Sequence, residues 1–403
     1  MRSESCDIFC TVVDNYGDIG VSWRLARQLA HEHDIRVRLW VDDLRSFAKL
    51  CPEANMELDE QRCHGVEVRH WCKNFPEVMP AELVIEAFAC KLPESYVEAM
   101  AAQEHQPVWL NLEYLSAEDW VEGAHKLPSP HLRLPLTKYF FFPGFTKKTG
   151  GLLLERDLLA RRDAFQTDSA SLTPALSPSP KSMWTGTRER EFWRSVGVPE
   201  RIAGELRISL FSYENEAVAG LLQAWAQGET EVLCCVPEGR VLPLVAAFFG
   251  QTAGKAGDTW QRGNLRVLVL PFVEQEKFDE LLWACDINFV RGEDSCVRAQ
   301  WAGKPFVWHI YPQHDGVHMQ KLRALNGLYG KDLSVLASQA NENLWLAWNG
   351  EGDIASAWQA YAAQRVELTH YAPAWSAKLA GNNLALNLLD FSSQVGRIRA
   401  FKI

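Results

Sequence analysis

Two short segments of the chain combine acidic residues with glycine, and each follows a strand-like run and precedes a helix-like run. The first is DNYGDIG at residues 14–20, and the second is RGEDS at residues 291–295. In a two-lobed α/β protein, such segments lie at the carboxyl ends of central strands and face a cleft between the lobes. The pattern favours an enzyme that brings a phosphate-bearing ligand from one lobe to carboxylates of the other.

The first segment places Asp14 at the end of a strand and Asp18 just before a helix that we predict from Val21 onwards. Gly17 and Gly20 permit a tight turn. Asp18 could serve only the helix N-terminus, where a carboxylate is favoured by the free amides and the helix dipole. In a partly dry cleft the same carboxylate can act as a general base that orients a nucleophile and takes its proton.

Two other functions of this segment have weaker support in the sequence. Asp42 follows a second strand at the distance that a dinucleotide site requires. The first glycine of G-x-G-x-x-G is missing, however. An aspartate at the position of the pyrophosphate would also repel the negative charge of that group by at least about 1 kcal/mol. Mg²⁺ bound by Asp14 and Asp18 is the other alternative, but two carboxylates without a phosphate in the same lobe make a poor site.

The second segment begins with Arg291 and leads into a helix that we predict from near Cys296. The first amides of a helix have no internal partner and, with the dipole, form an anion site. Arg291 adds a forked cation that suits phosphate, and Ser295 adds a hydroxyl. Glu293 and Asp294 repel a bare phosphate, so we expect them to bind sugar hydroxyls. The alternative is an ordinary capped helix with a solvated acidic first turn.

Other strands of the same half also end in aromatic and polar residues. Four of them can sandwich a nucleobase or pack in the core: Phe211, Tyr213, Phe272 and Phe278. The segment after the last strand offers Tyr311, Gln313, Asp315 and His318. Tyr311 can reach a phosphate oxygen, whereas His318 fits a capping or surface role better than a catalytic one.

Strand and helix patterns alternate in both halves, which predicts parallel sheets and two facing βαβ domains. Residues 164–182 are rich in Ser and Pro and show no periodic apolar face. We therefore predict four parts: a βαβ domain at 1–164, a linker at 165–183, a second βαβ domain at 184–370, and a helical segment at 371–403 that can return to the first domain.

The composition is that of a globular protein. The chain has 403 residues, too many for one ordinary core, and 47% of them are hydrophobic. A net charge of −10 argues against a nucleic-acid partner but suits a cationic acceptor. We see no leader and no apolar run long enough for a membrane span, so we expect a cytoplasmic protein with free thiols and no membrane partner.

Ten cysteines occur without a C-x-x-C pair. Cys63, His64, His70 and Cys72 cluster in the sequence, but their spacing matches no standard zinc pattern, and cysteine is often a small buried hydrophobe. We therefore predict no metal site.

Several motifs resemble the EarP family of protein-arginine rhamnosyltransferases, which modify and activate bacterial elongation factor P. The resemblance is carried by DNYGDIGVSWRLARQL at residues 14–29, NLEYLSAE at 111–118 and RGEDS at 291–295. It is extended by GGLLLERD at 150–157 and WAGKPFVWHIYPQ at 301–313. The Ser/Pro-rich segment fits the family pattern poorly.

The resemblance implies a GT-B glycosyltransferase with two facing Rossmann-like domains and an interdomain cleft: residues 1–164 form the acceptor and catalytic domain, and residues 184–370 form the nucleotide-sugar-binding domain. The donor would be dTDP-β-L-rhamnose and the acceptor an arginine of elongation factor P, with inversion at the sugar carbon and without a metal or other cofactor. The resemblance also implies that Asp18 is the general base, with Asp14 and Glu293 also essential. It places the donor pocket at Phe211, Tyr213, Phe272, Gln275, Phe278, Arg291, Asp294, Ser295 and Tyr311, to which we add Gly17. Glu113 and Tyr114 are a candidate docking segment for the acceptor.

Two rival functions stay open from the residues alone. One is a glycosyltransferase that uses a small-molecule or lipid acceptor. The other is a nucleotide-sugar-binding module that binds the donor tightly and transfers nothing.

Overall fold

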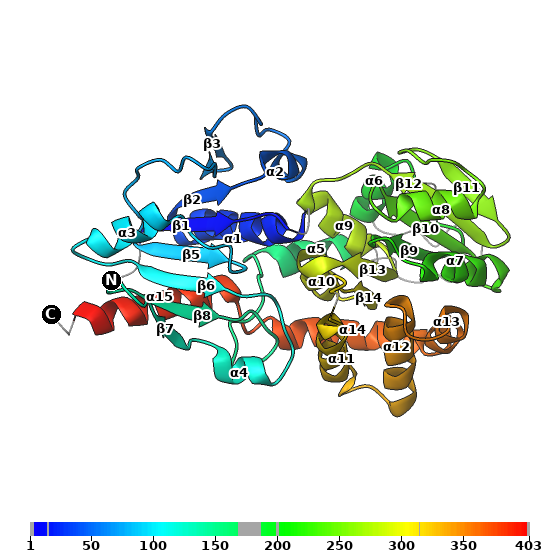
Figure 1. Cartoon of the computed structure of the whole chain (residues 1–403). Helices are drawn as coiled ribbons and strands as arrows, with labels where there is room; N and C mark the ends of the chain where they lie inside the picture. The colour runs from blue at the N-terminus through cyan, green and yellow to red at the C-terminus, as the bar shows by residue number, and fades with distance from the viewer. Residues whose placement is uncertain (1–3, 14–15, 168–186, 199–200, 314, 401–403) are drawn as a thin grey trace. The chain divides into compact units, whose positions relative to one another are not determined.

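The computed structural model describes residues 4–13, 16–167, 187–198, 201–313 and 315–400. The chain forms two compact units (Figure 1). The first runs up to Arg156 and resumes at Leu379, and the second is Asp157–Lys378. Asp14 and most of the Ser/Pro-rich segment lie outside the described residues.

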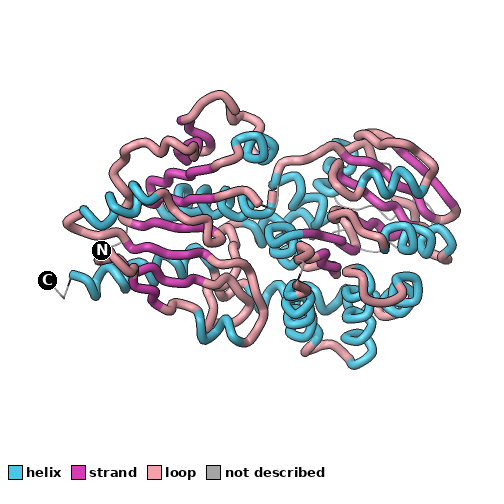
Figure 2. The backbone as a smooth tube through the Cα atoms, viewed as in Figure 1, coloured by secondary structure: helices cyan, strands magenta, loops and turns pink. Residues whose placement is uncertain are grey.

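The first unit contains an eight-stranded sheet in the order β3-β4-β2-β1-β5-β6-β8-β7 (Figures 1 and 2). The neighbours from β4 to β8 are parallel, while β3 and β7 are antiparallel edges. Counted from β1, the parallel strands follow the Rossmann order, which reverses between β1 and β5. The strands are β1 (Ser5–Cys10), β2 (Arg36–Val41), β3 (Glu60–Cys63), β4 (Val66–His70), β5 (Leu83–Ala87), β6 (Val108–Leu112), β7 (Pro128–Pro130) and β8 (Thr137–Phe141).

The apolar strands of this unit are buried because helices cover the sheet. Phe9 of β1 stacks on Trp40 of β2 at 5.7 Å and meets Tyr96 edge-on at 4.8 Å. One polar exception, Asp7 in β1, is fully buried and accepts two hydrogen bonds of 2.6 Å from Arg38 on β2. The helices are α1 (Gly17–His33), α2 (Leu44–Leu50), α3 (Glu94–Ala102), α4 (Trp120–Ala124) and α15 (Leu384–Ala400).

The C-terminal helix α15 belongs to the first unit, although more than two hundred residues of the second unit precede it in the chain. Leu152 forms an isolated parallel bridge with Asn383, just before the helix. The side-chain amide of Asn383 donates to the carbonyl of Leu154 at 2.5 Å, and that of Asn387 donates to the carbonyl of Gly150 at 3.0 Å. These bonds anchor the end of the chain.

The second unit contains a six-stranded sheet in the order β11-β12-β10-β9-β13-β14. All neighbours except the β11–β12 pair are parallel. This is again a Rossmann order, with its reversal between β9 and β13. The strands are β9 (Leu206–Leu210), β10 (Val232–Pro237), β11 (Thr259–Arg262), β12 (Leu265–Leu270), β13 (Ile287–Arg291) and β14 (Phe306–His309).

Helices make up the rest of the second unit, and the helical character that the sequence predicts after Pro312 is present in α11 to α15. The helices of this unit are α5 (Leu158–Thr167), α6 (Thr187–Ser195), α7 (Ala217–Gln227), α8 (Leu242–Phe248), α9 (Gln275–Ala284), α10 (Gly292–Trp301), α11 (Val317–Gly330), α12 (Val335–Trp348), α13 (Ile354–Ala363) and α14 (Arg365–Leu379). In the described residues, no helix combines the length and the apolar composition that crossing a membrane would need.

Three predicted element boundaries are wrong. Helix α1 begins at Gly17 rather than Val21, and α10 begins at Gly292 rather than near Cys296. In both cases the acidic residues belong to the first helical turn, where the dipole favours them. Helix α5 continues to Thr167, two residues past the predicted start of the linker at 165.

Candidate active site

Asp18 lies in the first turn of α1, which follows β1 at the point where the strand order of the first sheet reverses. Its side chain is only 3% exposed, and Oδ2 accepts a hydrogen bond of 2.9 Å from the amide of Val13. A carboxylate offers about four acceptor positions. The bond to Val13 therefore holds the side chain in place and is compatible with a role as proton acceptor.

A second carboxylate, Asp42, approaches the same end of β1. Its Oδ1 accepts from the amide of Val12 at 2.9 Å. Burial raises the pKa of the Cys10 thiol well above its ordinary value, and the nearby charges of Asp18 and Asp42 raise this pKa further. Negative charge therefore gathers at the end of this strand, which suits a cationic group such as a guanidinium. Gly17 is half-buried and starts the helix.

The loop after β5 is strained, and the sequence analysis missed it. Phe88, Ala89 and Lys91 all have positive φ, at 57°, 55° and 54°. This backbone conformation is uncommon for residues other than glycine, and such strain concentrates at functional sites. Two buried side chains hold the loop: Asn111 accepts from the amide of Ala89 at 3.1 Å, and Glu86 accepts from that of Lys91 at 3.2 Å. No glycine marks this loop in the sequence.

The proposed docking segment lies beside this strained loop. Tyr114 stacks on Phe88, with ring centroids 4.7 Å apart and an angle of 22° between the planes. The carboxylate of Glu113 accepts a hydrogen bond from the side-chain amide of Asn111. The structure thus joins the segment to the carboxyl ends of β5 and β6.

Arg291 is the last residue of β13 and lies at the strand-order reversal of the second sheet. Its guanidinium carbon lies 4.7 Å from the ring centroid of Phe211 and 4.6 Å from that of Tyr213. Both aromatic residues follow β9, the neighbouring strand. Two cation–π contacts fix the orientation of the fork, each contributing about 0.5–2 kcal/mol. Tyr213 is 2% exposed, so it supports Arg291 rather than presenting a free ring face.

The first turn of the helix that begins after Arg291 is held by hydrogen bonds between Ser295 and the backbone of Arg291. The backbone of Gly292 has a φ of +61°, which glycine adopts without strain. The hydroxyl of Ser295 accepts from the amide of Arg291 at 3.2 Å and donates to the carbonyl of the same residue. Ser295 therefore shapes the turn, and Glu293 and Asp294 in that turn are half-buried.

A buried ion pair, also missed from the sequence, fixes α9 against α10. Arg298 donates to both carboxylate oxygens of Asp279 at 2.8 and 2.6 Å, and neither side chain is more than 3% exposed. This pair sets the distance between Gln275, the first residue of α9, and Asp294, whose side chains contact at 3.5 Å. No clear signal in the sequence marks this pair, because both helices also carry other charged residues, such as Glu276 and Glu293.

The predicted aromatic residues surround Arg291 only in part. Phe278 meets Phe211 edge-on at 5.3 Å, and Tyr311 meets Tyr213 edge-on at 5.4 Å. Phe272 is half-buried in the loop between β12 and α9. Tyr311 is 39% exposed, so its ring and hydroxyl are the most accessible of the set in this unit.

Two histidines lie near this group. His309 at the end of β14 contacts the hydroxyl of Ser212 through Nδ1 at 2.7 Å. Burial lowers the pKa of His309 to about 4, and the charges of Arg291 and His318 contribute. His318 accepts from the amide of Gln313 through Nδ1 at 3.1 Å, which is a local capping contact.

These features define the class of protein. A solved structure described as "Structural basis for EarP-mediated arginine glycosylation of translation elongation factor EF-P" is 37% identical, with a TM-score of 0.66 over 97% of this chain and 99% of that one. The chain is a glycosyltransferase with the GT-B fold, as the sequence predicts.

The family is narrower than the fold. A family model described as Elongation-Factor P (EF-P) rhamnosyltransferase EarP matches residues 6–393. A protein-arginine rhamnosyltransferase of Pseudomonas putida is 50% identical over 386 residues, which are 96% of this chain and 97% of that protein. One of Pseudomonas aeruginosa is 46% identical over 388 residues, covering 96% and 98%. The chain belongs to the EarP family, and the resemblance seen in the sequence is confirmed.

Proposed function

We propose that this protein transfers a rhamnosyl group from dTDP-β-L-rhamnose to one arginine side chain of translation elongation factor P. The observation that carries the proposal is the 50% identity, over nearly the whole chain, to a protein named protein-arginine rhamnosyltransferase. The geometry of each unit supports a separate part of the reaction.

The first unit supplies the acceptor chemistry. A guanidinium is a poor nucleophile because its pKa lies above 12 and it stays protonated. Carboxylates such as Asp18 and Asp42, gathered at the end of β1, can localise its charge on one side and turn one nitrogen toward the sugar. We assign Asp18 as the base that takes the proton, and we keep Asp14 as a second essential carboxylate.

The second unit supplies the donor chemistry. Arg291, oriented by Phe211 and Tyr213, and the first amides of α10 stabilise the negative charge that develops on dTDP. Glu293 and Asp294 bind sugar hydroxyls. The remaining predicted residues of this unit stack on the nucleobase or contact the phosphates: Phe272, Gln275, Phe278, Ser295 and Tyr311. Gly17 of the first unit is the other residue that we assign to donor binding.

The reaction is a single displacement. An arginine nitrogen forms a bond to the anomeric carbon, the bond to dTDP breaks on the opposite face, and the nitrogen loses its proton to Asp18. One displacement inverts the anomeric configuration, giving an α-linked product. Cationic Arg291 and the helix amides replace the divalent cation that many glycosyl transfers use, so we propose catalysis without a metal.

The proposal is tested by incubating the purified protein with dTDP-β-L-rhamnose and elongation factor P. We expect the mass of elongation factor P to increase by one rhamnosyl residue, located on an arginine by peptide fragmentation. A spectrum of the product's anomeric proton then reports the configuration. The same incubation with chelator should give the same rate.

The matched control is elongation factor P in which the modified arginine is replaced by lysine, which should stay unmodified. Donor hydrolysis or transfer to a small molecule without any protein modification would contradict the acceptor assignment. Tight donor binding with no transfer to any acceptor would contradict the enzyme function itself.

A further inference from the structure

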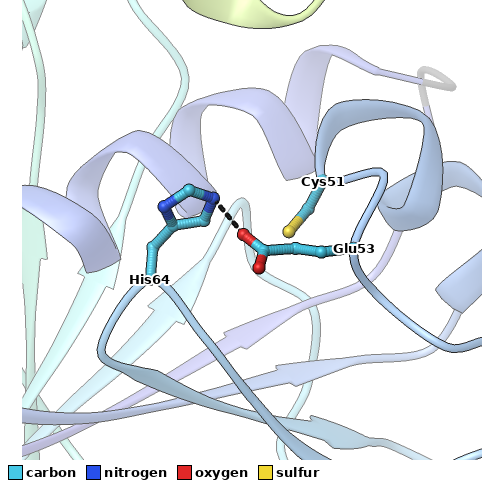
Figure 3. Close-up of side chains that lie close together, drawn as sticks. All are labelled: Cys51, Glu53 and His64. Carbon is cyan, nitrogen blue, oxygen red and sulfur yellow. Dashed lines mark ion pairs between the residues drawn. The ribbon is translucent and has the colours of Figure 1, made fainter.

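The first unit contains a cluster of metal-ligating side chains apart from the residues described above. Helix α2 leads into Cys51 and Glu53, and the turn between β3 and β4 carries His64. One ligand atom from each of these three residues lies within 4.8 Å of the other two. Figure 3 shows the His64 ring and the Cys51 sulfur on either side of the Glu53 carboxylate. Among the residues that the structure describes, this is the group of three or more His, Cys, Asp or Glu side chains whose ligand atoms all lie this close together.

A second thiol adjoins the cluster. Cys63, the last residue of β3, is buried, and its thiol is near enough to Cys51 to contribute to the raised pKa of the Cys51 thiol. Cys63 is not one of the three residues whose ligand atoms all lie within 4.8 Å of one another, and its thiol donates to Oε1 of Gln61 at 3.7 Å. The sequence analysis grouped Cys63 and His64 with His70 and Cys72, and the structure separates them. His70 contacts Asp59 at 3.0 Å, and the exposed Cys72 donates to the carbonyl of Asn74. Cys51 and Glu53, which follow α2, take the place of His70 and Cys72 in the cluster.

The backbone fixes His64 at the edge of the cluster. His64 and Gly65 form the two-residue turn of the β3–β4 hairpin, with φ values of 43° and 74°. Such a turn favours Asn or Asp at its first position, so the hairpin itself does not require histidine. The carbonyl of His64 lies 2.7 Å from Nε2 of His31, and the His64 ring packs edge-on against Trp23 of α1. The contact with His31 therefore fixes the backbone of the turn, and Trp23 packs against one edge of the imidazole, whose side chain is 48% exposed.

The side-chain chemistry of the cluster matches one metal. Two sulfurs, one imidazole nitrogen and one carboxylate oxygen make a tetrahedral zinc set, whose bonds of about 2.0–2.3 Å place ligand atoms about 3.3–3.8 Å apart. The Cys51 sulfur, within 4.8 Å of the other two ligand atoms, needs to move inward by at most about 1 Å to reach that spacing, whereas the Glu53 and His64 atoms need to separate by about 1 Å. The Cys63 sulfur would complete the set by approaching from β3. Glu53 and His64 already contact each other at 2.5 Å. A metal ion placed between the side chains would take the place of this direct contact.

We propose that Cys51, Cys63, Glu53 and His64 bind a zinc ion that ties the end of α2 to the β3–β4 hairpin. With all four positions filled by protein, the ion has no place for substrate, so the site is structural. Zinc stabilises the 51–64 segment because it binds the folded arrangement and not the unfolded chain. The inference does not depend on the proposed rhamnosyl transfer, which uses no metal.

Cobalt provides the direct test, because Co²⁺ occupies zinc sites and absorbs visible light. The full-length protein, reduced and freed of metal with a chelator, is titrated with Co²⁺ and then with Zn²⁺. We expect one equivalent of Co²⁺ to give a thiolate-to-metal charge-transfer band and the intense bands of a tetrahedral centre. Zn²⁺ should abolish both, and the zinc-loaded protein should melt at a higher temperature than the metal-free protein.

Two variants and two matched controls complete the test. Cys51→Ser and His64→Asn should each weaken zinc affinity by at least about 100-fold. Asn suits the left-handed turn, so the second variant stays informative if the first fails to fold. Cys72→Ser and His70→Asn change the same residue types outside the cluster and should bind zinc like the parent. The proposal is overturned if no charge-transfer band develops, or if Cys51→Ser and His64→Asn bind zinc as tightly as the controls.

Discussion

At the scale of single residues, two buried side chains of opposite charge carry the proposed reaction. Asp18 is held by the amide of Val13 in the first unit, and Arg291 is held between Phe211 and Tyr213 in the second. Each is fixed by groups of its own unit. Preorganisation of this kind is what makes a charge effective in a transition state, because no reorientation is needed during the reaction.

The first prediction concerns Asp18→Asn. Asparagine keeps an oxygen that accepts from the Val13 amide, so the loop should retain its shape, but an amide cannot act as a base. We expect kcat to fall by about 10²–10⁴-fold with the dissociation constant for dTDP unchanged. Rates come from the mass-shift assay, and binding comes from calorimetry.

The matched control is Asp42→Asn, which removes a neighbouring charge held in the same way by Val12. It should lower kcat far less. Loss of dTDP binding in a well-folded Asp18→Asn protein would show that Asp18 acts in the donor pocket instead.

The second prediction concerns Arg291→Lys. Lysine keeps the charge but loses the planar fork and its stacking against two rings. We expect dTDP to bind about tenfold more weakly, a change of roughly 1.4 kcal/mol in binding free energy. Calorimetry measures this directly. Arg240→Lys is the control, because Arg240 also lies over the Tyr213 ring, at 5.9 Å, but pairs with Glu214 near the surface. Equal affinities for the parent and Arg291→Lys would refute the phosphate role.

At the scale of elements, the proposed donor site depends on how α10 and β14 meet the end of β13. The indole nitrogen of Trp308 on β14 donates to the carbonyl of Gly292 at 2.7 Å, which links the strand to the start of the helix. The Arg298–Asp279 pair links the same helix to α9. Removing one partner of such a buried pair costs about 3–5 kcal/mol, since the other charge stays buried. Helix α10 is therefore held by β14 at its first residue and by α9 in its last turn.

The third prediction concerns the pH dependence of stability that His309 causes. Its folded pKa of about 4 lies below the value of about 6.5 in an unfolded chain, so acid favours the unfolded state. This contribution is complete above pH about 6.5 and is lost as the pH falls toward 4. It should remove roughly 2 kcal/mol of unfolding free energy between pH 7 and pH 5.

The measurement is urea unfolding at both pH values for the parent and for His309→Asn. The variant should lose less stability on acidification, and replacement of the exposed His105 by Asn should leave the parent's pH dependence intact. Identical pH dependence in His309→Asn and the parent would contradict the assignment of the effect to His309.

At the scale of the whole molecule, the first unit is completed by the two ends of the chain. The backbone at Gly150 and Leu152 contacts Asn383, just before α15, and Asn387, in the first turn of α15. The first unit therefore cannot finish folding until the second has been synthesised. A chain that ends before Leu379 lacks these partners.

The fourth prediction tests that junction with Gly151→Ala. Gly151 has a φ of +80°, and an added Cβ would overlap the carbonyl of Asn382. We expect a loss of at least about 2 kcal/mol in unfolding free energy, measured by urea unfolding. Gly123→Ala in α4 is the control, since a Cβ there meets nothing within 4 Å and alanine favours a helix. Equal stability of the two variants would mean that the tail does not pack as described.

From the sequence alone come the alternation of strands and helices, the two short segments that bear Asp18 and Arg291, and the family. These are local properties: apolar periodicity, turn residues and short motifs each lie within one stretch of chain. The predicted starts of α1 and α10 are wrong because acidic residues suit a loop and a first helical turn equally well.

Only the tertiary structure decided which distant residues meet. Tyr213 proved to lie beneath Arg291, Arg298 to pair with Asp279, and Glu53 to contact His64, and none of these pairs is marked by its spacing in the sequence. The strained loop at Phe88–Lys91 could not be foreseen either, because its conformation is imposed by Glu86 and Asn111 on two adjacent strands. Contacts across a sheet depend on strand order, and strand order is set by the packing of the whole unit.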